Sequence, residues 1–194
     1  MTNKGMLGNI SLAEFQRLRN DLEQKCAGDD GEIWLDAFKR FLRKENPWDD
    51  LDLVRVDRTI LPTYPDWVKE VLYPELESTG PAEFDTVELW LHDMQKKDDS
   101  LSGYTIHKYL KDNDMIKDCL GLRDLEEIQK KGIVFFRKHF KGKAVSGWKS
   151  IVLINNGQYG VPYLYESGDH QVCIHWKWLV DGWSACRPAL LFSN

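Results

Sequence analysis

A basic segment followed by aromatic residues is the arrangement in this sequence that could bind a ligand. Cations bind phosphate groups by releasing counterions, and exposed aromatic rings stack on bases. Basic and aromatic residues together therefore meet the minimum requirement for a surface that binds nucleic acid. The more common alternative is a solvated helix face beside aromatic residues that belong to the core. The candidate binding residues are Lys130, Lys131, Arg137, Lys138, Lys141, Lys143, Lys149, Trp176 and Trp178.

The distribution of charge supports a binding role for this segment. No Asp or Glu occurs from Ile128 to Tyr165. Residues 1–127 contain 28 acidic and 17 basic side chains, whereas residues 128–194 contain 3 and 9. Complementary potentials can steer a partner or bring two copies of a chain together. The sequence therefore predicts a nucleic acid or a protein as partner, or a homo-oligomer formed by charge complementarity, and does not decide between them.

Cys173 and His175 carry the competing hypothesis, an enzyme. They lie two residues apart in a strand-like segment, and a thiol beside an imidazole can act as a nucleophile or as half of a metal site. A carboxylate from elsewhere in the chain would have to complete the site. Asp49, Asp50 and Asp52 could bind Mg²⁺ or act as acid and base, but such runs are usually solvated loops or caps.

Sequence signatures of known catalytic sites are missing. The chain contains no Gly-x-Ser-x-Gly, no phosphate-binding glycine-rich loop and no His-Glu-x-x-His. We therefore expect no cofactor and no metal. The sequence favours a non-catalytic binding protein over an enzyme with a dispersed site and over a self-associating structural protein.

Helical spacing dominates the first two thirds of the chain. Ser11 precedes an apolar pattern with Glu14 three residues later, which predicts a capped helix over residues 11–27. A second helix begins at Asp29 or Asp30 and ends at Asn46–Pro47, because a residue before proline leaves the helical region. Further helices are expected at residues 65–72, 84–91, 105–111 and about 120–140, the last with a kink or close contact at Gly132.

The period of the apolar residues changes at Trp148. Residues 151–154, 159–165 and 172–178 show the pattern of strands, and the last two alternate with a period of two. Asn156–Gly157 and Ser167–Gly168–Asp169 separate them and favour hairpin turns. Residues 189–192 form a possible fourth strand. The expected fold class is α+β, with N-terminal and central helices followed by a C-terminal antiparallel β-meander of three or four strands.

Composition places the chain among ordinary globular proteins. Its 194 residues are 42% hydrophobic and 29% charged, which suffices for a packed core. A polar stretch near residues 95–100 suggests an acidic, mainly helical region 1–97 and a region 98–194 with a helical hairpin and the sheet, unless both form one domain. We expect no secretory signal and no membrane span. Four widely separated cysteines indicate a cytoplasmic protein.

Three segments carry a resemblance to a known group of sequences. Residues 32–48, residues 117–132 and the segment Val161–Tyr165 are similar to a family of uncharacterised hypothetical proteins predicted from genomes of uncultured bacteria. The resemblance covers most of the chain. It implies a bacterial cytosolic setting and assigns no activity, so no site residue follows from it.

Overall fold

The computed structural model describes residues 11–43, 52–97 and 100–193. The chain divides into two compact units, Met1–Leu51 and Asp52–Asn194. Strands that precede residue 97 pair with strands that follow residue 98 inside the second unit. The structure therefore groups the residues differently from the division at 97 and 98 that the sequence suggested.

The first unit contains two helices that contact each other, α1 (Leu12–Ala27) and α2 (Gly31–Leu42). The side chain of Ser11 accepts a hydrogen bond from the backbone N–H of Glu14 at 3.2 Å, which confirms the predicted cap. The expected end of α2 at Asn46–Pro47 lies outside the described residues.

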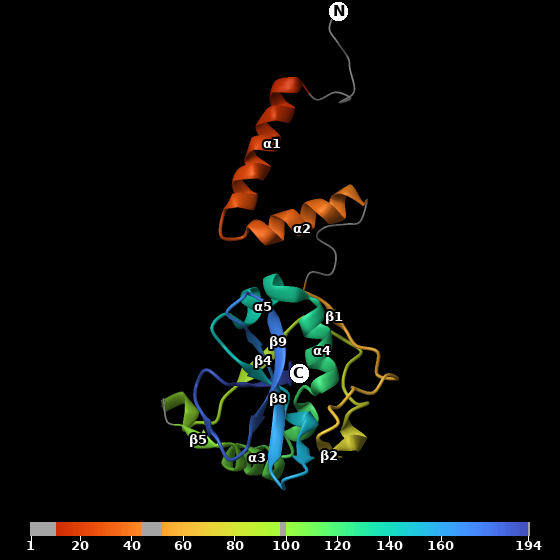
Figure 1. The fold of residues 1–194 in the computed structure, drawn as a ribbon, viewed down its shortest axis with the longest axis vertical. Coiled ribbons are helices and arrows are strands. Elements are labelled where there is room, and N and C mark those ends of the chain that lie inside the picture. The colour runs from red at the N-terminus through yellow and green to blue at the C-terminus, as the bar shows by residue number, and fades with distance from the viewer. Residues whose placement is uncertain (1–10, 44–51, 98–99, 194) are drawn as a thin grey trace, which may run out of the picture. The chain divides into compact units, whose positions relative to one another are not determined.

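The second unit is built on a seven-stranded sheet with two short ladders beside it (Figure 1). Six strands follow the order β2-β7-β8-β6-β11-β4, and β9 pairs with the other edge of β8. The sheet strands are β2 (Val68–Val71), β4 (Val87–Trp90), β6 (Val145–Ser146), β7 (Val152–Ile154), β8 (Tyr159–Glu166), β9 (Val172–Trp178) and β11 (Ala189–Phe192). The ladders pair β1 (Val54–Arg55) with β3 (Glu83–Phe84) and β5 (Leu101–Ser102) with β10 (Gly182–Trp183).

The predicted meander is present as β7, β8 and β9, joined by two hairpins. Gly157 has φ +84° in the first turn, the left-handed conformation that the Asn–Gly pair predicts. In the second turn the left-handed residue is His170, with φ +60°, rather than Gly168. The α+β fold class is confirmed.

The predicted strand at residues 189–192 exists, but it joins a different part of the sheet. β11 pairs in parallel with β6 and antiparallel with β4, so it does not extend the meander. The helices expected at residues 65–72 and 84–91 are wrong, because these segments contain β2, β3 and β4. Short apolar segments follow the partners available in the folded sheet more than their own local pattern.

The remaining helices are close to the prediction. They are α3 (Gly103–Asp112), α4 (Leu122–Lys130) and α5 (Gly132–Phe140), with single 3-10 turns at Pro74–Leu76, Gln95–Lys97, Ile116–Asp118 and Trp148–Ser150. Gly132 has φ +80° and divides the expected long helix in two. A left-handed residue cannot continue an α-helix, and glycine adopts this conformation without steric cost.

Helices cover different faces of the sheet, and each forms a core there. α4 and α5 pack Leu125, Ile128 and Phe136 against Leu164 of β8. α3 packs Ile106 and Leu110 into a second cluster with Val161, whose side chain lies on the opposite face of β8 from that of Leu164. In Figure 1, α3 lies apart from the pair formed by α4 and α5.

Within the described ranges, no helix has both the length and the apolar character that a membrane span requires.

Candidate functional site

The basic segment lies largely on and after α5, where its cations meet carboxylates that are distant in sequence. Arg137 donates to Glu166 Oε1 at 2.6 Å, and Lys138 Nζ lies 2.6 Å from Asp52 Oδ2. The neighbouring helix α4 contains its own pair, Lys130 with Glu127, at 2.8 Å. These ion pairs offset much of the positive charge that the sequence concentrates here.

The other predicted cations differ in how far they reach the surface. Lys131 is half-buried and follows α4 as its C-cap, Lys141 is exposed and Lys143 is half-buried after α5. Lys149 is only 1% exposed. The structure therefore brings Arg137 and Lys138 beside carboxylates and removes Lys149 from the surface. Of the acidic run proposed as a metal or acid–base site, Asp52 is engaged by Lys138, and Asp49 and Asp50 lie outside the described residues.

Lys149 belongs to a buried polar network that the sequence did not reveal. Its Nζ donates to the carbonyl of Thr79 at 3.2 Å and lies 5.0 Å from the ring centroid of Phe192. Desolvation by burial lowers the pKa of this amine, although the nearby Asp124 opposes the effect. So little of Lys149 reaches solvent that it adds no charge to the surface.

Glu77 lies in the same network. Its Oε1 accepts hydrogen bonds from the Tyr64 hydroxyl at 2.5 Å and from the Ser150 hydroxyl at 2.6 Å, and Ser150 Oγ in turn accepts from the backbone N–H of Leu122 at 2.6 Å. Desolvation by burial raises the pKa of Glu77 against these hydrogen bonds. The ring of Tyr64 also lies 6.3 Å from that of Trp176, so the network supports the aromatic residues described next.

Trp176 and Trp178, the aromatic members of the predicted site, lie on one face of β9. Residues two apart in a strand share a face, so this face continues from Val172 through Ile174. α4 and α5 cover the first end, where the Gln129 side chain donates to the carbonyl of Val172 at 2.9 Å. The two tryptophans lie at the other end of the strand and remain partly exposed.

Trp67, immediately before β2, completes this aromatic surface. Its ring lies edge-on to Trp176 at 5.2 Å and 87°, and to Trp178 at 5.9 Å and 78°. Trp67 itself is 37% exposed. Edge-to-face pairs of this kind stabilise the arrangement of the three rings.

Gly160 of β8 lets the ring of Trp178 lie close to the strand. Gly160 is paired directly with Trp178 across the two strands. A Cβ atom at this position would lie 2.7 Å from the Trp178 ring, which is too close for a real contact. The position of Trp178 therefore depends on the absence of a side chain at residue 160.

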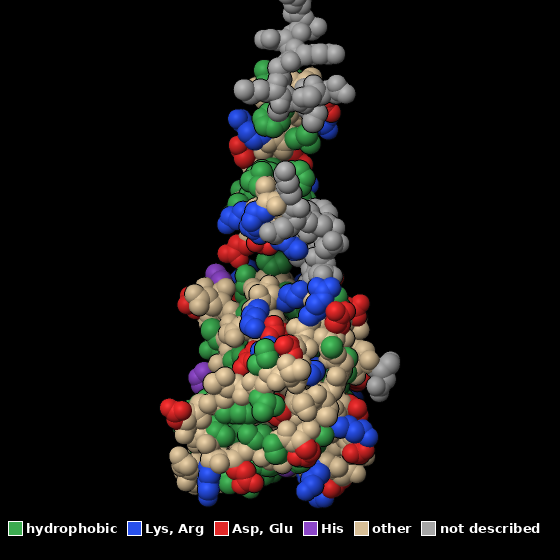
Figure 2. All heavy atoms as spheres, turned by 90° about the vertical axis from the view of Figure 1, so that its right-hand side faces the viewer, with side chains coloured by type: hydrophobic (Ala, Val, Ile, Leu, Met, Phe, Trp, Pro, Cys, Tyr) green, Lys and Arg blue, Asp and Glu red, His purple; other side chains and the backbone are tan. Residues whose placement is uncertain are grey.

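Around these rings lies an open groove of about 590 Å³. Figure 2 shows hydrophobic side chains gathered on the face of the second unit near β2, with charged side chains around them. Aromatic and apolar side chains dominate the lining, and Asn and His supply its polar groups. The groove is lined by Pro65, Trp67, Ile154, Asn155, Asn156, His175, Trp176 and Trp178.

Of Cys173 and His175, the two residues named by the enzyme hypothesis, only His175 lies at this groove. His175 lines it, and its ring lies beside Tyr163 and Tyr165, at 6.0 and 6.3 Å between centroids. Cys173 is half-buried and does not line the groove. In the part of the chain that the structure describes, no carboxylate is hydrogen-bonded to either residue, and no three His, Cys, Asp or Glu side chains form a metal cluster. Among the described residues, the predicted thiol, imidazole and carboxylate do not come together.

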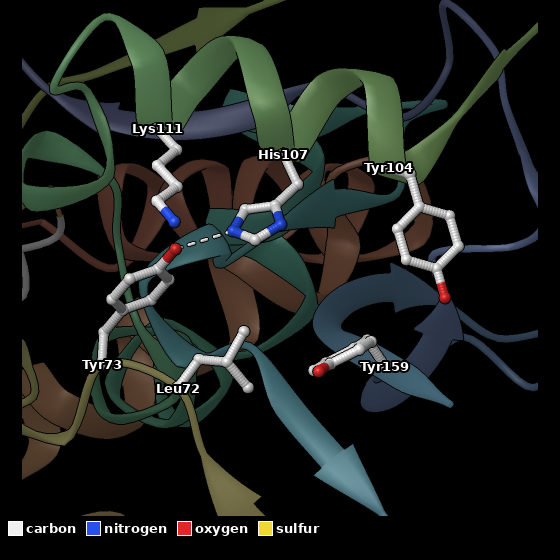
Figure 3. A pocket seen from close by; sticks show the side chains of 6 residues that line it. All are labelled: Leu72, Tyr73, Tyr104, His107, Lys111 and Tyr159. Carbon is white, nitrogen blue, oxygen red and sulfur yellow. Dashed lines mark hydrogen bonds between the residues drawn. The ribbon is translucent and has the colours of Figure 1, made fainter. Parts of the chain in front are cut away.

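A smaller pocket of about 380 Å³ lies on the α3 side of the sheet (Figure 3). It is lined by Leu72, Tyr73, Tyr104, His107, Lys111 and Tyr159. Sequence reasoning placed a helix here but missed the pocket. The spacing of Tyr104, His107 and Lys111 was a possible signal, because residues three and four apart share one side of a helix.

Comparison of the chain with known protein families, with curated proteins and with solved structures finds no match.

Proposed function

We propose that this protein is a non-catalytic binding protein that holds an extended, uncharged, proline-containing segment of a partner protein in the groove between Trp67, Trp176 and Trp178. The observation that carries the proposal is the set of three fixed, partly exposed tryptophan rings. Proline-rich segments in the polyproline II conformation dock into aromatic-lined grooves because they are already extended and lose little entropy on binding.

The polar groups of the groove fit such a segment. An extended chain without internal hydrogen bonds presents free carbonyl and N–H groups. Asn155, Asn156 and His175 line the groove and can donate to or accept from these groups. Pro65 of the protein also contributes to the lining, so a proline ring already forms part of this groove.

The charge of the groove favours a peptide over a nucleic acid as its ligand. The lining residues, all of them described, include no Lys, Arg, Asp or Glu. A nucleic acid bound here would have its phosphates without cations, which normally supply most of its affinity. The cations of α5 pair with Glu166 and Asp52 instead. These observations favour the protein partner among the two that the sequence suggested.

The full chain should be titrated with short, uncharged, proline-rich peptides while tryptophan fluorescence is recorded. We expect saturable binding that peptides with proline replaced by alanine do not show. Trp67→Ala should weaken binding about 30-fold, because a central tryptophan in an interface contributes roughly 2 kcal/mol or more. Trp90→Ala, in β4 and outside the groove, is the matched control and should leave affinity unchanged.

Two results would overturn this proposal. One is the absence of saturable binding to all the proline-rich peptides. The other is binding of single-stranded DNA or RNA that falls steeply with added salt and survives Trp67→Ala, since it would assign the function to the basic segment. We also propose that the protein acts in the cytoplasm, which its four free cysteines support.

A further inference from the structure

The pocket beside α3 has a built arrangement of polar groups that the proposed peptide groove does not use. Tyr104, His107 and Lys111 project from one side of α3, and Tyr73 and Tyr159 face them from the end of β2 and the start of β8 (Figure 3). Its volume of about 380 Å³ is in the range of sites for small molecules.

One end of the pocket is cationic and rich in hydrogen-bonding groups. The hydroxyl of Tyr73 lies 2.7 Å from His107 Nε2, and the amino group of Lys111 points toward the same hydroxyl (Figure 3). Desolvation, reinforced by the charge of Lys111, lowers the pKa of His107 and keeps its ring neutral at physiological pH. Lys111 is therefore the permanent charge of this end.

Lys111 has its charge available for a ligand. It has no ion pair with any residue in the described ranges, whereas Lys108 on the same helix pairs with Asp112. The pocket lining also contains no carboxylate that would compete for it. An anion entering here would meet one positive charge and the Tyr73–His107 pair. Burial, together with the charge of Glu75 outside the lining, raises the pKa of Tyr73, so its hydroxyl stays protonated.

The opposite end of the pocket is neutral. Tyr104 and Tyr159 lie edge-on to each other, with ring centroids 6.4 Å apart, and both present hydroxyl groups (Figure 3). Leu72 provides an apolar contact between the two ends. A ligand that fits has one negative group, an apolar or aromatic body and a group that hydrogen-bonds to phenols.

We propose that this pocket binds a small organic carboxylate, with its carboxylate at Lys111 and the Tyr73–His107 pair and its body against Leu72, Tyr104 and Tyr159. A monoanion matches the single lysine, whereas a phosphate dianion would leave one charge unpaired. At the N-terminus of α3, the Tyr104 N–H is not a free donor for the ligand, because it already lies 3.3 Å from both Ser102 Oγ and the carbonyl of Leu179.

The test uses 4-hydroxybenzoate and its uncharged analogue 4-hydroxybenzamide as probes on the full chain. Binding is measured by ligand-observed NMR titration. We expect the carboxylate to bind at least about tenfold more tightly than the amide, since one charge-assisted hydrogen bond distinguishes them. Lys111→Gln should remove this preference, and Tyr73→Phe should reduce it.

Lys108→Gln is the matched control, because Lys108 lies on the same helix but does not line the pocket. It should leave the preference for the carboxylate unchanged, as should Trp67→Ala in the groove. Equal binding of the carboxylate and the amide, an unchanged preference in Lys111→Gln, or no saturable binding of the carboxylate would overturn the proposal. Binding to the groove is measured with peptides and binding to the pocket with small anions. Failure of one proposal is therefore distinguishable from failure of the other.

Discussion

Removing one hydroxyl group from Tyr64 tests the buried polar network beneath the aromatic groove. Tyr64→Phe keeps the ring that packs 6.3 Å from Trp176 and deletes the 2.5 Å hydrogen bond to Glu77. Ser150 is then the remaining described donor to Glu77 Oε1, while Oε2 is buried without a hydrogen-bond partner among the described residues. The carboxyl group of Glu77, a residue only 5% exposed, thus loses one of its two described donors.

The expected cost follows from the strength of such bonds. A hydrogen bond to a charged group contributes about 1.5–3 kcal/mol, so Tyr64→Phe should lower the free energy of unfolding by about 2 kcal/mol where Glu77 is ionised. For a chain of this size that corresponds to a melting temperature lower by about 4–8 °C. Thermal unfolding followed by circular dichroism measures this change.

The loss of stability in Tyr64→Phe should depend on pH, because the hydrogen bond acts on a titratable group. The Tyr64 hydroxyl lowers the pKa of Glu77 in opposition to burial, so it stabilises the ionised carboxylate more than the neutral acid. The loss should therefore be larger near pH 7 than near pH 4, because a raised pKa keeps Glu77 protonated in the folded state at about pH 4. For the same reason, stability that Glu77 contributes at low pH is lost as the pH rises through its folded pKa, and Glu77→Gln should reduce that slope.

Tyr109→Phe is the control. Tyr109 is 41% exposed, and its hydroxyl has no hydrogen bond to a described residue. This variant should change stability by less than about 0.5 kcal/mol. If Tyr64→Phe were no more destabilising than Tyr109→Phe, or equally destabilising at both pH values, the network would not be the polar support described above.

Two further substitutions test the groove and the basic segment. Gly160→Ala places a methyl group against the Trp178 ring, so it should destabilise the protein by about 1–3 kcal/mol in urea unfolding and shift tryptophan fluorescence. In the control, Gly168→Ala, the new Cβ meets nothing within 4 Å, so neither stability nor fluorescence should change. Equal effects of the two variants would contradict the packing argument. Arg137 and His170 hold the pKa of Glu166 below its usual value, so Glu166→Gln should lower the melting temperature more near pH 7 than in acid, since the contribution of an acid with a lowered pKa is lost as the pH falls through it. The same decrease at both pH values would show that the ion pair adds nothing.

The sequence predicted those parts of the fold that local pattern determines. The alternation in residues 159–165 and 172–178, with turn residues between them, identified β8 and β9, and Ser11 identified the start of α1. β2 and β4 were mistaken for helices because their strand character comes from pairing with β7 and β11, which lie far away in sequence. No window around Val68 or Val87 contains those partners.

The candidate site could likewise be predicted only where local sequence pattern determines it. Trp176 and Trp178 could be selected from the sequence because their spacing places them on one strand face. Trp67 could not, since it reaches them only through the long-range pairing of β2 with β7. The ion pairs of the basic segment were hidden for a related reason: counting charges along the chain cannot show that Glu166 and Asp52 lie beside Arg137 and Lys138.

Adjacent residues at the start of β8 lie at the two proposed sites. Tyr159 lines the pocket beside α3, and its neighbour Gly160 lies beneath the Trp178 ring of the groove. Because adjacent residues of a strand face opposite sides, the pocket and the groove lie on opposite faces of the same strand end. One ligand of small size cannot reach both, so the two sites must be independent in their contacts. Changes at Trp67 and at Lys111 should therefore act separately, and each variant serves as the folding control for the other site.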